Sequence, residues 1–209
     1  MARFPPFPDR EEAGSRLAAE LPALDRPIVL ALPRGGVPVA AAVARALGAP
    51  LDVFVVRKLG LPAQPELAMG AIASGGVRVL NDEVLRQAAV PAAVLEEVTA
   101  RERAAVEARE RLYRGDRPAP ALAGRDVVLV DDGLATGATM RAAVVAVRAH
   151  GPSRVVVAVP IAPAETVAAF RWAGIELACV HVPDDFVSVG SWYRDFGQVS
   201  DEEVIRLFP

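Results

Sequence analysis

The sequence predicts an α/β fold in which a doubly wound parallel sheet carries helices on both faces. Short, continuous apolar runs such as residues 28–32 and 127–130 are typical of strands covered on both sides. These runs alternate with Ala-rich segments of about ten residues whose apolar positions recur at helical spacing. Because strands and helices alternate, neighbouring strands are expected to run parallel, with the helices packed above and below them.

The first half of the chain is expected to begin with a Pro-rich lead-in and a short helix within residues 1–26. Asp9 and Glu12 have the spacing of a capping box at the start of that helix. A strand over residues 28–32, a helix over residues 37–47 that Gly48 ends, and a strand over residues 51–56 would then complete a βαβ unit.

The second half repeats the alternation. The expected order is a strand at 127–130, a helix from about Met140 to His150, a strand at 155–159, a helix at 164–172 and a strand at 175–180. Two segments interrupt it. Residues 67–80 read as a hairpin around Ser74-Gly75-Gly76. Residues 91–114 read as a charged helix with Glu and Arg four residues apart, most simply a solvated helix.

Size and composition restrict the class of protein. The 209 residues, 53% of them hydrophobic, suit a single domain over residues 1–209, with a core at about 27–160. The net charge of −3 predicts no nucleic-acid partner, and the apolar runs are too short for a membrane span. The N-terminus has prolines and charges in place of a signal peptide, and the single cysteine, Cys179, reads as a core residue. A cytoplasmic protein is expected.

The stretch VVLVDDGLATGATM, residues 127–140, carries the strongest chemical signal. A buried strand ends in two carboxylates, Asp131 and Asp132, which suit sugar hydroxyls or Mg²⁺. Gly137 and two threonines then lead to a helix N-terminus, where free N–H groups favour phosphate. The alternative is an Asp-rich turn that only caps a helix. The glycine motifs of P-loop and Rossmann proteins are absent from the sequence.

This stretch resembles the phosphoribosyl-pyrophosphate (PRPP) signature of the type I phosphoribosyltransferases, and the resemblance covers most of the chain. It implies Asp131 and Asp132 as catalytic residues and as ligands of a Mg²⁺ cofactor. The segment Leu32-Pro33-Arg34-Gly35-Gly36 is similar to the family's pyrophosphate loop, which often contains a cis peptide, here expected at Pro33–Arg34. The residues implied to bind PRPP are Gly35, Gly36, Gly133, Leu134, Ala135, Thr136, Gly137, Ala138 and Thr139.

The segment Val56-Arg57-Lys58-Leu59-Gly60 resembles the start of the family's flexible catalytic loop, which would run from about 58 to 70. Lys58 is the single lysine in the chain and falls where the family carries basic residues toward pyrophosphate. The resemblance therefore implies Arg34, Arg57 and Lys58 as catalytic residues that receive the leaving group. Glu66 is the best candidate for an acid or base, although a solvated loop glutamate explains it as well.

The family's hood, which grips the acceptor base, is expected from residues 182–209 together with the N-terminal segment. Phe186 and Trp192 are its candidate base-binding residues, with Asp184 and Asp185 as polar contacts, although core packing explains the aromatic cluster nearly as well. Ala135 stands where the 6-oxopurine enzymes have an Asp that helps to move a proton on the base. That role therefore cannot be transferred to this chain.

The resemblance implies a phosphoribosyltransferase that binds PRPP and Mg²⁺ and transfers the phosphoribosyl group to a nitrogen acceptor, releasing pyrophosphate. Its partners would be PRPP and a small-molecule acceptor, such as a nucleobase, and the protein would be a homodimer, as is usual in the family. The alternative function is a regulatory protein that binds PRPP or a nucleotide with little or no transferase activity. That alternative predicts a basic surface or an added nucleic-acid module, and the sequence shows neither.

Overall fold

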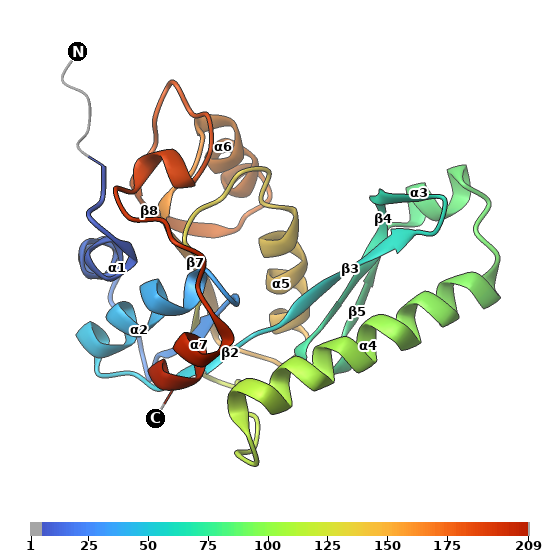
Figure 1. The fold of residues 1–209 in the computed structure, drawn as a ribbon, viewed down its shortest axis with the longest axis horizontal. Helices are drawn as coiled ribbons and strands as arrows, with labels where there is room; N and C mark the ends of the chain where they lie inside the picture. The colour runs from blue at the N-terminus through green and yellow to red at the C-terminus, as the bar shows by residue number, and fades with distance from the viewer. Residues whose placement is uncertain (1–5, 209) are drawn as a thin grey trace.

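A computed structural model of the protein describes residues 6–208, so the first five residues of the expected Pro-rich lead-in lie outside it. Its centre is a parallel sheet with the strand order β2-β1-β6-β7-β8 (Figure 1). Every neighbouring pair in this sheet is parallel, as the sequence predicts. The strands are β1 (Ile28–Ala31), β2 (Leu51–Val53), β6 (Asp126–Val130), β7 (Arg154–Ile161) and β8 (Glu176–His181).

Helices cover both faces of this sheet, which confirms the predicted fold class (Figure 1). Successive side chains of a strand point to opposite faces, so Val127 and Leu129 pack in one core and Val128 and Val130 in the other. The first core contains residues of α5 (Ala138–Arg148) and α6 (Ala164–Trp172). The second contains residues of α1 (Arg10–Ala19), α2 (Gly36–Leu47) and α7 (Asp201–Leu207).

The expected helix ends are present. The Asp9 carboxylate accepts a hydrogen bond from the backbone N–H of Glu12 at 2.8 Å and caps α1. Gly48 ends α2 in the left-handed conformation with φ of 59°. A helix at α7 was not predicted from the sequence, although Ser200 caps it by accepting from Glu203 N.

A second, antiparallel sheet and two helices form an arm that extends from the α/β body (Figure 1). The arm contains β3 (Val56–Leu61), β4 (Gln64–Ala73), the 3-10 turn η1 (Ser74–Gly76), β5 (Arg78–Leu80), α3 (Asp82–Gln87) and α4 (Ala92–Arg114). The hairpin predicted over residues 67–80 is confirmed as β4 and β5. The charged helix predicted over 91–114 is α4, but it is not fully solvated, because Val98 and Val106 on one face are buried.

Two predictions about the start of the arm are wrong. The strand expected over residues 51–56 is two strands, because the chain leaves the parallel sheet after Val53. Val55, between the two strands, donates its N–H to Ser74 Oγ at 2.8 Å and accepts from Ser74 N, so the chain turns toward the antiparallel sheet there. The loop expected over residues 58–70 is mostly the hairpin of β3 and β4, whose inner residues Leu59 and Met69 are fully buried.

The N-terminal segment contacts a stretch of the chain that follows β8. Phe7 pairs with Tyr193 in a parallel bridge, and Phe7 N donates to Trp192 O at 2.8 Å. This contact joins the N-terminal segment to the turn η2 (Gly190–Trp192). Within residues 6–208, no helix combines the length and hydrophobicity that a membrane crossing requires.

Candidate functional site

The candidate site lies where the order of the parallel strands reverses. From β1 the chain winds through α2 to β2 on one side, whereas β6, β7 and β8 follow one another on the other side. β1 and β6 are direct neighbours, and Ala31 pairs with Val130 near their carboxyl ends. The loops that leave these strands, residues 32–36 and 131–137, therefore open side by side. Such a switch point is where open α/β sheets bind ligands.

Glycines allow the two loops to touch. A Cβ atom on Gly35 would overlap Asp132 Oδ2, and one on Gly36 would lie 2.8 Å from Asp131 Cα. The peptide bond between Pro33 and Arg34 is cis, as the family resemblance implies. The structure thus brings together the glycine loop and the two carboxylates, which lie almost one hundred residues apart in the sequence.

The two carboxylates differ in their partners. Asp131 Oδ1 accepts a hydrogen bond from Asp132 N at 2.9 Å. Asp132 Oδ2 accepts two from Arg10, from Nε at 3.0 Å and Nη2 at 2.9 Å. Burial raises the pKa of Asp131 well above its usual value, and the charge of Asp132 raises it further. Burial also raises the pKa of Asp132, whereas the Arg10 guanidinium opposes that increase.

The predicted phosphate loop is fixed at its base and open at its tip. Leu134 is buried and donates its N–H to Ile161 O at 2.9 Å, and Ala135 O accepts from Thr166 Oγ1 at 2.6 Å. Gly137 precedes α5 with φ of 70°, a conformation that disfavours any side chain there. Thr136, Ala138 and Thr139 are exposed around this helix N-terminus. The loop is therefore held at its base by hydrogen bonds, and its tip is exposed at a helix N-terminus, a position that favours anions.

The three predicted basic residues have separate partners. Lys58 Nζ lies 3.0 Å from Glu66 Oε2, and Lys58 shares with Thr139 the lining of a groove of about 260 Å³ between the arm and α5. Arg34 Nη1 lies 3.7 Å from Asp201 Oδ1. Arg57 faces α4, where it binds Glu102. Lys58 therefore lies near the phosphate loop, whereas the guanidinium of Arg57 is held by Glu102 of α4.

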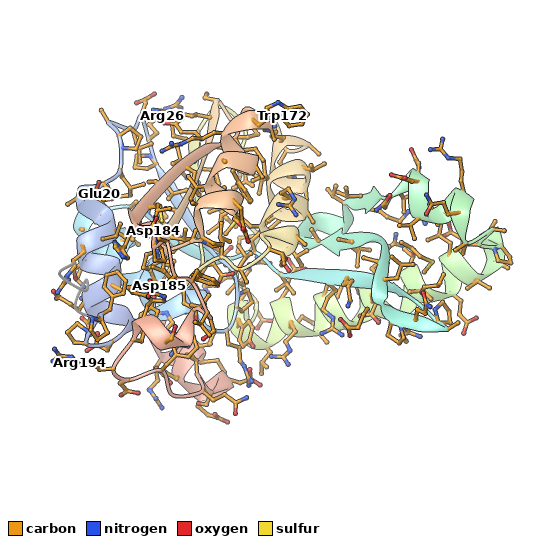
Figure 2. All side chains as sticks on the ribbon, turned by 90° about the horizontal axis from the view of Figure 1, so that it is seen from above. Glu20, Arg26, Trp172, Asp184, Asp185 and Arg194 are labelled. Carbon is orange, nitrogen blue, oxygen red and sulfur yellow. The ribbon has the colours of Figure 1, made fainter. Side chains whose placement is uncertain are left out.

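Asp184 and Asp185, two of the predicted hood residues, lie on the α/β body, on the side away from the arm (Figure 2). Phe186 and Val189 are partly buried against the cluster that contains Phe7 and Trp192. Trp192 is only 8% exposed, and its ring lies 5.0 Å from that of His181. This burial favours a packing role for Trp192 and leaves Phe186 as the more accessible ring.

The carboxylate pair fits a magnesium ion in its chemistry. Carboxylate oxygens are the hard ligands that Mg²⁺ prefers, and a cation would offset the repulsion that raises the pKa of Asp131. Arg10 already engages Asp132 Oδ2, so the protein offers few oxygens. Over residues 6–208, no cluster of three or more His, Cys, Asp or Glu side chains is arranged to hold a metal. An ion at this pair would need most of its ligands from a substrate or water.

Sequence reasoning missed two contacts at Asp132. Arg10 comes from α1, where its guanidinium lies 3.9 Å from the centre of the Phe196 ring and donates to Gly197 O. Tyr193 donates its hydroxyl to Asp132 O at 2.6 Å. No local pattern marks these two residues, because the sequence near each chain end contains several arginines and aromatic residues.

The phosphoribosyl transferase domain family matches residues 64–173, which is more than half of the chain. The chain belongs to this family. A solved protein from Thermus thermophilus, TT1426, is 50% identical, with a TM-score of 0.87 and 97% of each chain covered. A hypothetical protein from Neisseria gonorrhoeae, solved with bound ppGpp, shares the fold at 15% identity and a TM-score of 0.52, covering 95% of this chain and 90% of its own.

Two curated proteins from strains of Mycobacterium tuberculosis, each named "Putative phosphoribosyl transferase", are 50% identical to this chain over 203 residues. The match covers 96% of this chain but 46% of each relative. The chain therefore spans about half the length of the curated relatives it matches.

Proposed function

We propose that this chain transfers the phosphoribosyl group of PRPP to a nitrogen acceptor and releases pyrophosphate. The observation that carries the proposal is the contact of Gly35 with Asp132 at the switch point between β1 and β6. That contact supports the proposal because it joins a glycine loop with Arg34 to a carboxylate pair suited to a ribose, and the helix N-terminus suited to its phosphate follows a few residues later. A sugar that carries phosphates at both ends needs these three groups together.

In the proposed reaction the acceptor nitrogen forms a bond to the anomeric carbon of the ribose. The bond from that carbon to the pyrophosphate oxygen breaks, the electron pair leaves with pyrophosphate, and the acceptor loses a proton. Positive charge develops on the sugar and negative charge on the leaving group, so preorganised electrostatics should supply most of the catalysis.

Each part of the chain has a role in this proposal. Residues 136–139 anchor the 5-phosphate and fix the sugar, and Asp131 and Asp132 bind its hydroxyls. Arg34, Arg57 and Lys58 receive the charge of the leaving group. Asp131 and Asp132 would hold Mg²⁺, which when bound neutralises the pyrophosphate charge. Closing of the β3–β4 hairpin over the bound PRPP would exclude water, which competes as a nucleophile.

The acceptor is proposed to lie under the hood, with Phe186 as its stacking surface and Asp184 and Asp185 as polar contacts. Trp192 then supports the hood from beneath. Glu66 is an unsuitable acid or base in this arrangement, because its carboxylate is 99% exposed and already paired with Lys58. Since Ala135 replaces the acidic residue of the 6-oxopurine enzymes, an acceptor that needs no such residue is favoured.

The experiment is a screen of nitrogen acceptors with PRPP and Mg²⁺ in which pyrophosphate release is measured. Asp132→Ala and Lys58→Ala should abolish transfer while circular dichroism shows an intact fold. Unchanged turnover in either variant would contradict the assignment. Tight PRPP binding without pyrophosphate release for any acceptor would instead support the regulatory alternative.

A further inference from the structure

Helix α4 carries a carboxylate in a place where an apolar residue would be expected. Its buried face contains Val98, Glu102 and Val106, which recur four residues apart, and the helix packs against β3 and β4. Val98 and Val106 pack with Leu59, Met69 and Ile72 of the arm. Glu102 interrupts this stripe although it is only 8% exposed. A buried charge is costly unless it is paired, so its partner indicates its purpose.

The partner of Glu102 is Arg57, the arginine that opens the predicted catalytic segment. Glu102 Oε2 accepts from Arg57 Nε at 3.0 Å and lies 2.9 Å from Nη2. Arg101 donates to the other oxygen, Oε1, at 3.1 Å, which fixes the carboxylate plane. The side chain of Glu102 is 11% exposed and that of Arg57 is 49% exposed. Glu102 therefore anchors one side of the Arg57 guanidinium while the other side faces solvent.

Near its C-terminal end, α4 holds the carboxylate that pairs with Arg34, the second arginine of the proposed pyrophosphate site. Asp201, the first residue of α7, lies 3.7 Å from Arg34 Nη1 through its Oδ1 atom. That same oxygen accepts from the hydroxyl of Tyr113 at 2.6 Å and from Arg109 Nη1 at 2.9 Å, both on α4. The hydrogen bond from Tyr113 lowers the pKa of Asp201, so its carboxylate stays charged beside Arg34.

We infer that α4 is a brace that positions the two arginines for pyrophosphate, with Glu102 orienting Arg57 and Asp201 orienting Arg34. Both carboxylates act through an arginine and touch no substrate themselves, so they are positioning residues. The inference rests on the proposed function and adds to it the role of an inserted helix. It explains why a carboxylate occupies a buried position of α4 and why α7 packs against the end of that helix.

The test compares Glu102→Gln and Asp201→Asn with Glu107→Gln, a matched control on the exposed face of α4. Inorganic pyrophosphate with Mg²⁺ and ribose 5-phosphate are titrated separately into the full chain by calorimetry. Both positioning variants should weaken pyrophosphate binding about tenfold or more and raise KM for PRPP, because a displaced guanidinium loses its alignment. Ribose 5-phosphate, held by residues 136–139, should bind all three variants within about twofold of the wild type.

A double variant separates positioning from general stability. In an Arg57→Gln background, adding Glu102→Gln should cause no further loss of pyrophosphate binding, because Glu102 acts only through Arg57. The inference is overturned if Glu102→Gln and Asp201→Asn bind pyrophosphate as tightly as the wild type or more tightly. It is also overturned if the losses of binding free energy from Arg57→Gln and Glu102→Gln add up in the double variant. If Glu102→Gln does not fold, the pyrophosphate affinity of Asp201→Asn tests the inference by itself. This variant should fold, because the Asp201 side chain is one-third exposed. A wild-type chain that binds neither pyrophosphate nor PRPP would refute the proposed function instead.

Discussion

The ion pair between Arg10 and Asp132 gives a quantitative prediction for Arg10→Gln. The two side chains are only 11% and 15% exposed, so removal of Arg10 leaves a largely buried carboxylate beside Asp131 without its counter-charge. Breaking a buried pair costs about 3–5 kcal/mol, and the remaining exposure favours the lower end, about 3 kcal/mol. For a chain of this size the melting temperature should fall by about 6–12 °C.

The loss should depend on pH in a defined direction. Burial raises the pKa of both carboxyl groups, and Arg10 opposes that rise. Without Arg10 the folded-state pKa values rise further. A carboxyl group whose pKa is higher in the folded state than in the unfolded state destabilises the fold when it is ionised. This destabilisation disappears as the pH falls through the folded-state pKa, because the group then becomes protonated. The difference in unfolding free energy between wild type and Arg10→Gln should therefore be largest near neutral pH and shrink on acidification.

Urea denaturation at several pH values measures both effects. Arg45→Gln is the matched control, because Arg45 pairs with Glu11 in a contact where both side chains are about two-thirds exposed. This variant should lose less than about 1 kcal/mol. The reasoning is refuted if Arg10→Gln loses no more than the control, or if its deficit grows as the pH is lowered.

Three further substitutions test other parts of the site. Gly35→Ala should weaken PRPP binding more than about tenfold in calorimetry, because its Cβ displaces the Asp132 carboxylate, and wild-type affinity would exclude the close approach. Gly137→Ala combines φ of 70° with a Cβ 2.5 Å from Phe170 Cε2, so urea denaturation should show a loss of about 2–4 kcal/mol; a neutral effect would contradict the loop geometry. Glu66→Gln should change kcat/KM less than about threefold, whereas a loss near a hundredfold would identify Glu66 as an acid or base.

Most of the fold was predictable because its signals are local. Apolar runs, Gly48 after α2 and the capping box at Asp9 determine where strands and helices begin and end. The two wrong predictions, for residues 51–56 and 58–70, have a common cause. The apolar run at 51–56 continues without a break in the sequence, and only the pairing of Val55 with Ser74 divides it between two sheets. Pairing over such distances leaves no trace in local hydrophobicity.

The sequence alone determined the two loops of the site, because a strand end, adjacent carboxylates and a glycine before a helix are features of neighbouring residues. Only the tertiary structure decided which side chains control them. Arg10 reaches Asp132 across 122 residues of chain, and α4 supplies Glu102 to Arg57 across 45. An ion pair depends on where two elements pack, and the identity of an arginine or a glutamate does not encode its partner.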